Sequence, residues 1–283
     1  MVKFPFSGRQ VLLSGIFLVL LFWGLNWLLP GLRSHWAFFP LWLGYILILN
    51  GWTQIRKGDS LLSRDLRTWL LLFLTSAPVW WIFEWLNKVA EYWQYLGVEA
   101  FTDLEYNIFA TISFSTVIPA IFSTSEWLAS FQFTNRFRRG IKAGAKRGTR
   151  IFFFILGWLM LAFFLYMPQY GAAFLWMSLY FILDPVNYWL GYPSLLKETA
   201  KKNWRTVLIL WIASLICGFF WEMWNYFAYP KWIYEVPFVD FWYIFEMPLP
   251  GYLGYLPFAL ELYAMYHFIL GILAVKPRHH FII

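Results

Sequence analysis

The chain has 283 residues, of which 61% are hydrophobic, 24% aromatic and only 13% charged, with a formal net charge of +7. A soluble domain is about 25% charged, and a water-soluble protein of this size cannot bury so much apolar surface, so a soluble cytosolic enzyme is excluded. Disordered chains are poor in aromatic residues, and a single cysteine, Cys217, excludes a disulfide scaffold. The composition therefore indicates a polytopic membrane protein.

Long apolar segments predict the membrane helices. A spanning helix needs about 20 mostly apolar residues. Eight segments meet this requirement: 11–29, 36–52, 68–86, 108–125, 151–167, 171–189, 206–227 and 251–275. The first segment has no small-residue cleavage site after it, so we expect a retained helix rather than a removed signal peptide. The expected fold is an all-α integral membrane protein with eight transmembrane helices.

The basic residues predict how these helices are oriented. All Lys and Arg residues except Arg33, Lys88 and Lys231 fall on one side of the predicted membrane. The positive-inside rule then places both termini in the cytoplasm, and we expect the membrane to be a bacterial or archaeal plasma membrane. The basic segment 134–150 is expected to contact anionic lipid headgroups at the cytoplasmic face, and no binding of nucleic acid is expected.

The two halves of the sequence carry the same landmarks. Trp81-Ile-Phe-Glu-Trp-Leu-Asn87 ends the third predicted helix, and Phe219-Phe-Trp-Glu-Met-Trp-Asn225 ends the seventh. The glutamates of the two motifs are 138 residues apart, and so are Pro119 and Pro257, which we expect inside the fourth and eighth helices. Each half therefore has Glu-x-x-Asn followed by a loop and a proline-containing helix.

These landmarks suggest an internal duplication. We expect two four-helix repeats, residues 1–140 and 141–283, and we expect the second to carry the site. An even number of spans in each half gives both halves the same orientation, related by a two-fold axis along the membrane normal. The alternative is a coincidence among apolar helices of low complexity.

Ionisable and amide side chains inside the predicted helices are the candidates for a functional site. An ionisable group within a membrane helix costs about 2.5 kcal/mol or more, so its presence suggests a function. Most of these residues are in the second half: Asp184, Asn187, Glu222, Asn225, Glu246, Glu261 and His267. The alternative for each carboxyl is a structural role, in which a protonated group satisfies a neighbouring helix.

The depth of these polar residues in the predicted membrane divides them into two groups. Glu222, Asn225, Glu261 and Glu246, the last at the outer edge of the eighth helix, are expected to converge in the outer half of the membrane. Asp184 and Asn187 lie closer to the cytoplasm and are expected to form a separate network.

The first half has fewer of these residues. Ser123 stands at the place of Glu261, and no histidine matches His267, so the first half is interpreted as a degenerate partner of the second.

Several common chemistries have no counterpart in the sequence. There is no glycine-rich phosphate loop and no pair of aspartate-rich motifs for a magnesium diphosphate. The four histidines have no spacing suited to a metal. We therefore expect neither a metal nor another cofactor.

Aromatic residues are dense around the proposed site. Trp221, Trp224, Trp232 and Tyr234 are expected to line a pocket for a long apolar ligand, and aromatic faces can also stabilise a carbocation. The loop 228–250 is too long for a simple turn and too aromatic for a solvated one, and it is expected to fold back as a lid.

Three motifs together resemble the integral-membrane carotenoid (lycopene) cyclases and carotenoid hydratases. They are Trp221-Glu-Met-Trp-Asn225, Trp232-Ile-Tyr234 and Pro257-Phe-Ala-Leu-Glu261. The resemblance covers residues 219–268 and implies duplicated helical units and carboxyls that protonate a polyene. The sequence departs from that family because Phe-Ala-Leu separates Pro257 from a single glutamate, and because eight spans exceed the usual number.

These observations lead to three hypotheses for the function. The first is a membrane enzyme that acts on an isoprenoid or similar lipid, with Glu222 and Glu261 as acid and base and Asn225 as an orienting group. The second is a proton- or cation-coupled transporter or channel that uses the same carboxyls. The third is a subunit that binds a lipid or pigment without catalysis.

Overall fold

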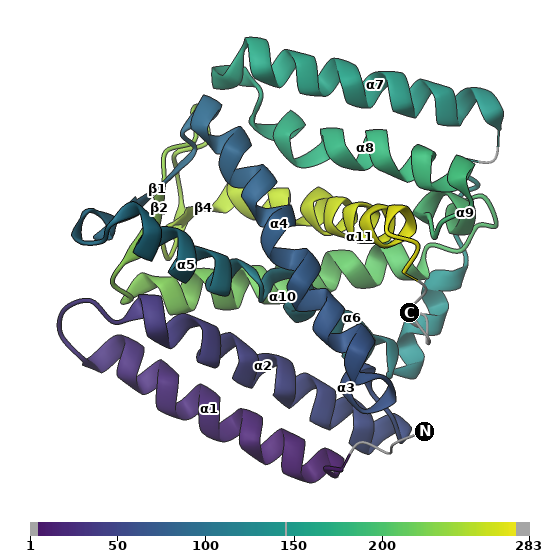
Figure 1. Cartoon of the computed structure of the whole chain (residues 1–283). Helices are drawn as coiled ribbons and strands as arrows, with labels where there is room; N and C mark the ends of the chain where they lie inside the picture. Colours follow the sequence, from purple (N-terminus) through teal and green to yellow (C-terminus); the bar gives the residue numbers. More distant parts are fainter. Residues whose placement is uncertain (1–4, 145, 276–283) are drawn as a thin grey trace.

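The structure is a computed structural model that describes residues 5–144 and 146–275. Within these residues the chain is almost entirely helical, which confirms the predicted all-α class. In Figure 1 the hairpin of α1 and α2 lies along one side of the molecule and the hairpin of α7 and α8 along the other, with the remaining long helices between them. The extreme ends of the chain, 1–4 and 276–283, on which the predicted location of the termini depends, are outside the described residues.

The elements follow one another in a similar order in the two halves. The first half contains α1 (Gly8–Leu28), α2 (Ser34–Lys57), α3 (Leu61–Arg64), α4 (Leu66–Ala90), β1 (Trp93–Leu96), η1 (Val98–Ala100), α5 (Asp103–Phe114), α6 (Val117–Ala129) and η2 (Gln132–Arg138). The second half contains α7 (Arg147–Tyr166), η3 (Pro168–Tyr170), α8 (Ala172–Leu190), α9 (Leu195–Thr199), α10 (Arg205–Tyr226), β2 (Lys231–Tyr234), β3 (Tyr243–Ile244), β4 (Met247–Pro248), η4 (Leu249–Gly254) and α11 (Tyr255–Ile272).

Helices occupy all eight segments that the sequence predicts to be apolar spans. Six helical segments are long and apolar enough to cross a membrane: α1, α4, Asp103–Ala129, α7, α10 and Leu249–Ile272. The two other long helices, α2 and α8, pack along α1 and α7. Large apolar side chains of α1 and α7 are exposed on the outside of the molecule, which is the arrangement expected where a helical membrane protein faces lipid.

Glycines allow α1 and α2 to approach closely. A Cβ atom on Gly51 would lie 2.4 Å from the backbone nitrogen of Leu12, and one on Gly15 would lie 2.6 Å from the carbonyl oxygen of Gly44. Small residues at helix interfaces are typical of membrane proteins because they let the backbones pack against each other.

Pro119 and Pro257 lie at the beginnings of helices, not inside them as the sequence predicted. The predicted fourth span is divided into α5 and α6, and Pro119 is the third residue of α6. Pro257 is likewise the third residue of α11, which follows the 3₁₀ helix η4. Proline is tolerated there because the amide groups of the first helical turn have no acceptor within the helix.

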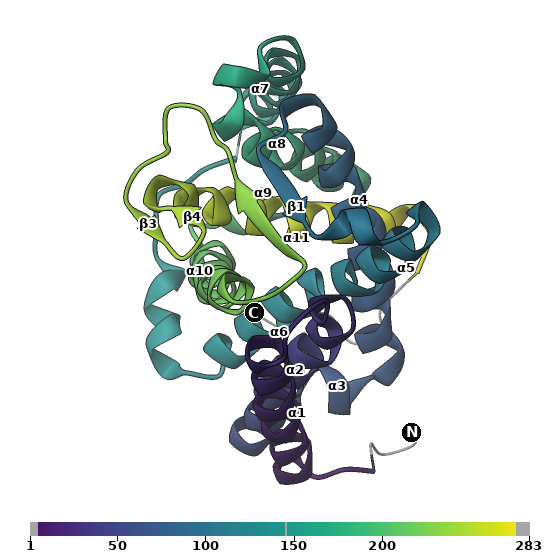
Figure 2. The same ribbon diagram turned by 90° about the vertical axis from the view of Figure 1, so that its left-hand side faces the viewer.

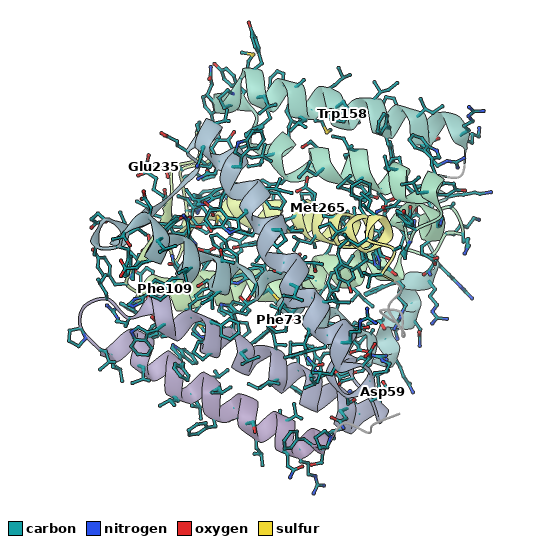
Figure 3. All side chains as sticks on the ribbon, viewed as in Figure 1. Asp59, Phe73, Phe109, Trp158, Glu235 and Met265 are labelled. Carbon is teal, nitrogen blue, oxygen red and sulfur yellow. The ribbon has the colours of Figure 1, made fainter. Side chains whose placement is uncertain are left out.

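A two-stranded ribbon links the two halves at one end of the molecule. β1 follows α4, β2 follows α10, and the two strands pair antiparallel with Trp93 opposite Tyr234 and Tyr95 opposite Trp232. Figure 2 shows the ribbon lying across the ends of the long helices. Glu235, next to β2, is at this end, whereas Asp59, between α2 and α3, is at the opposite end (Figure 3).

The segment between β2 and α11 also differs from the prediction. Glu246 was expected at the outer edge of the eighth helix, but it lies between the short strands β3 and β4, well before α11 begins. Pro248 and Pro250 cannot donate the backbone hydrogen bonds that an earlier helical start would need. The carboxylate of Glu246 forms an ion pair with Lys231 instead.

Candidate functional site

A large aromatic cavity lies beneath the β1–β2 ribbon, between the two halves of the chain. Its volume is about 920 Å³, and its walls include Trp80, Trp93, Trp176, Trp221, Tyr255 and Phe258. Residues of α2 and α5 extend the wall on one side, and residues of α8, α9 and α10 extend it on the other. The cavity is within the size range of small-molecule sites in proteins, about 300–1,000 Å³.

The ribbon forms the roof of this cavity. Alternate residues of a strand point to the same face, so Trp93 and Tyr95 of β1 share a face, as do Trp232 and Tyr234 of β2. All four of these residues line the cavity. On the other face, the Gln94 side-chain amide donates to the Glu235 carboxylate at 3.2 Å.

Glu222 of α10 is the carboxyl that the second half brings next to the cavity. Its Oε1 accepts hydrogen bonds from the hydroxyls of Tyr234 at 2.8 Å and Tyr255 at 2.6 Å. Both tyrosines line the cavity. Oε2 of Glu222 is buried and has no hydrogen-bond partner among the described residues. Burial, reinforced by the nearby Glu222 carboxyl, raises the pKa of Tyr234 well above its ordinary value, so the phenol remains a donor.

Asn225 fixes the strand that carries Tyr234. Its side-chain amide donates to the carbonyl of Trp232 at 2.7 Å, and its carbonyl oxygen accepts from the backbone nitrogen of Trp232 at 3.0 Å. One turn of α10 therefore supplies the carboxyl and the group that holds the strand above it. Asn225 was expected to orient a ligand, but in this structure its side chain binds the backbone of Trp232.

The first half contains a cluster of the same kind around Glu84 of α4. Its Oε1 accepts from the Tyr95 hydroxyl at 2.5 Å, from Nε1 of Trp80 at 2.8 Å and from Nε1 of Trp93 at 3.1 Å. Asn87 holds β1 as Asn225 holds β2, through bonds of 2.8 and 3.3 Å to the backbone of Trp93. The half interpreted as degenerate thus has its own carboxyl, phenol and amide beneath the ribbon.

Glu261 and Asp184 form their hydrogen bonds with segments other than those that surround Glu222. The Oε1 atom of Glu261 accepts from the backbone nitrogen of Leu179 in α8 at 3.0 Å. The Asp184 carboxylate accepts from the Ser194 hydroxyl at 2.9 Å and from the backbone nitrogens of Leu195 and Leu196 at 2.8 and 2.9 Å. Both carboxyls therefore bind backbone amides of other segments, Asp184 at the start of α9.

The remaining predicted site residues also have contacts outside the cavity. The Asn187 side-chain amide donates to the carbonyl of Ala264 at 2.8 Å, which joins α8 to α11. The His267 ring packs 4.3 Å from the ring of Tyr263, centroid to centroid. Trp224 packs against Trp42, with 5.0 Å between the ring centroids, on the side of α10 that faces α2. Trp221, by contrast, lines the cavity and stacks on Tyr255.

Sequence reasoning missed several residues of this site. Tyr95 had a usable signal, because Trp93-Gln-Tyr95 repeats the Trp-x-Tyr pattern of Trp232-Ile-Tyr234, six residues after Asn87 where the other is seven residues after Asn225. Tyr255 had none, since its partner Glu222 is 33 residues away and belongs to another helix. Trp176 and Phe258 lie in apolar helices where nothing in the pattern separates cavity walls from lipid-facing residues.

No cluster of three or more His, Cys, Asp or Glu side chains that could hold a metal ion lies within residues 5–144 and 146–275. Comparison of the whole chain with known proteins found no matching family model, no matching curated protein and no matching solved structure.

Proposed function

We propose that this protein is a membrane enzyme that isomerises or cyclises a long isoprenoid polyene by proton transfer. The observation that carries the proposal is the Glu222 carboxyl, held by two tyrosine hydroxyls that line a large aromatic cavity. The site is built from the chain's own acids and phenols, so the reaction is proposed to need no cofactor.

The walls of the cavity support an apolar ligand. Indole and phenyl rings dominate the lining, and Lys231, which also lines the cavity, is already paired with Glu246. The same rings favour a ligand that becomes positively charged during the reaction, because the negative faces of Trp and Tyr attract cations. Trp221 is next to Glu222 in α10, and Tyr255, which donates a hydrogen bond to Glu222, stacks on Trp221.

The proposed first step moves one proton. Glu222 starts as the neutral acid, and Tyr234 is placed between it and the cavity. If the Tyr234 hydroxyl turns towards the ligand, its proton passes to a carbon of a double bond while the Glu222 proton passes to the phenol oxygen. Glu222 becomes a carboxylate, the phenol is unchanged, and the ligand becomes a carbocation. Loss of a proton from a neighbouring carbon then gives an isomer or a cyclised product of the same formula.

Mass spectrometry of lipid extracts from protein purified in mild detergent tests this proposal, with lycopene supplied to the expressing cells as the polyene probe. We expect lycopene to co-purify and an isomeric product to accumulate. In Glu222→Gln the lycopene should still bind, and the product should fall by about 100-fold or more, the usual contribution of a general acid. Glu235→Gln, on the outer face of the ribbon, is the matched control.

Three results would count against an enzyme of this kind. A bound and unaltered polyene in the wild type would favour a binding subunit. Full turnover in Glu222→Gln would remove Glu222 as the acid. Recovery of phospholipid alone would favour a transporter or channel, and proton flux in liposomes would then be measured.

We also infer that all eight long helices cross the membrane and that residues 1–140 and 141–283 are parallel repeats. The register of the ribbon supports this inference, because Trp93 opposite Tyr234 and Tyr95 opposite Trp232 is the pairing that a two-fold axis between equivalent strands produces. The basic segments then face the cytoplasm of a plasma membrane, where they contact anionic lipid.

Cysteine labelling tests the orientation. In a Cys217→Ser background, Glu235→Cys should react with a membrane-impermeant maleimide added outside intact cells. Asp59→Cys, at the opposite end of the molecule, should react only after the membrane is opened. The reverse pattern would invert the proposed topology.

A further inference from the structure

The geometry points to Tyr95 and Glu84 as the base of the reaction, paired with Tyr234 and Glu222 as the acid across one cavity. This inference rests on the proposed function and assigns the second of its two proton transfers. It gives the first half of the chain a chemical role of its own.

Tyr95 lies on the ribbon close to Tyr234. Tyr95 lines the cavity and lies directly opposite Trp232 in the ribbon, where the Cα atoms of facing residues are about 5 Å apart. Tyr234 is on the same face of the ribbon, two residues from Trp232. A ligand beneath the roof is therefore within reach of both phenols, one from each half.

The two carboxyls also differ in the groups that surround them. Glu84 receives three hydrogen bonds on one oxygen, from Tyr95, Trp80 and Trp93. Lys88 is one helical turn further along α4, so it lies on the same side of the helix. Three donors and a neighbouring cation stabilise the carboxylate of Glu84 more than two phenols stabilise that of Glu222, and the carboxylate is the form that a base requires.

Glu222 has fewer groups around it that stabilise a negative charge. Its Oε1 accepts two phenol hydrogen bonds, and its Oε2 is buried without a partner. No Lys or Arg forms an ion pair with either glutamate among the described residues, but only Glu84 has a lysine one helical turn away. These surroundings favour the neutral acid. Two carboxyls whose environments differ in this way are the usual arrangement for an acid and a base at one site.

The second step then balances the first. The carbocation loses a proton from a carbon next to the charge, and the C–H electron pair forms the new double bond. That proton passes to the oxygen of Tyr95, while the Tyr95 proton passes along its existing hydrogen bond to the Glu84 carboxylate. The ligand leaves with its formula unchanged, Glu84 is protonated and Glu222 is ionised. Proton exchange with water at the outer end of the molecule restores both.

Turnover of lycopene in deuterated water separates the two roles. In Glu84→Gln and in Tyr95→Phe we expect lycopene to bind, product formation to fall by about 100-fold or more, and recovered lycopene to gain deuterium. The deuterium appears because the Glu222 pair still protonates the ligand and takes a proton back. Glu222→Gln should give neither product nor deuterium, and Glu235→Gln should behave as the wild type.

Each other outcome has a definite meaning. If Glu84→Gln and Tyr95→Phe form product at the wild-type rate while Glu222→Gln does not, the base assignment is wrong and the proposed function stands. If Glu84→Gln binds lycopene but shows no exchange, or no longer binds it, Glu84 has another role and the assignment is overturned. If Glu222→Gln is fully active, or the wild type neither exchanges nor converts lycopene, the proposed function itself fails.

Discussion

Replacing Asp184 distinguishes a structural carboxyl from a ligand-binding one. The side chain is fully buried and accepts three hydrogen bonds, two of them from the first backbone amides of α9. A buried amide that loses its acceptor costs about 1–3 kcal/mol. Asp184→Ala leaves two such amides without a partner, so we expect the free energy of unfolding to fall by about 2–6 kcal/mol.

Asn50 supplies the matched comparison. In the first half its Oδ1 accepts from the backbone nitrogen of Leu62, at the start of α3, at 3.0 Å. An amide at the corresponding place can therefore hold the start of such a short helix. Asp184→Asn keeps one acceptor oxygen and loses the second, so its cost should be that of a single amide, about 1–3 kcal/mol.

Thermal unfolding in detergent measures this difference. The midpoint should fall in the order wild type, Asp184→Asn, Asp184→Ala, while protein that remains folded keeps its bound lycopene. If Asp184→Ala unfolded at the wild-type temperature but lost lycopene, Asp184 would contact the ligand and the structural assignment would be refuted.

Three further predictions concern packing, the ribbon and high pH. Gly51→Leu should prevent the close approach of α1 and α2, because even a Cβ atom would be 2.4 Å from a backbone nitrogen. Size-exclusion chromatography should therefore show a lower yield of folded protein. Gly24→Ala is the control, because no atom lies within 4 Å of the added Cβ. Asn225→Leu should release the backbone of β2 and lower lycopene binding more than Asn225→Asp, and equal binding in both variants would contradict it. Burial raises the pKa of Tyr92 to about 12, whereas the unfolded chain ionises near pH 10. The folded state therefore holds more protons above about pH 10, stability should decline from there towards pH 12, and Tyr92→Phe should reduce the slope of the unfolding midpoint against pH.

The sequence was most informative where one local property decides the structure. A run of about 20 apolar residues specifies a helix in lipid because backbone groups there must be satisfied internally, and every predicted span is helical. Glu-x-x-Asn was also informative, because residues three apart share a helical face. Glu222 and Asn225 do lie together, with the carboxyl towards Tyr234 and the amide towards Trp232.

The sequence was least informative where distant segments meet. β1 and β2 have four residues each and are joined through pairs as distant as Trp93 and Tyr234, so no local pattern identifies either strand. Depth along the chain suggested that Glu261 would join Glu222, but its position on α11 directs it to the backbone of α8. Asp184 resembles an intramembrane functional carboxyl until α9, which supplies its partners, is placed beside it.

The ribbon makes the two halves depend on each other. Each half contributes one strand and one phenol to the roof and one helix carboxyl that binds that phenol, and residues of both halves line the cavity. A chain cut between η2 and α7 would yield two helical fragments, each with an unpaired strand edge that only the other fragment fits. Separate expression should therefore give inactive pieces, and mixing them in one membrane should rebuild the site through the strand pairing rather than through a peptide bond.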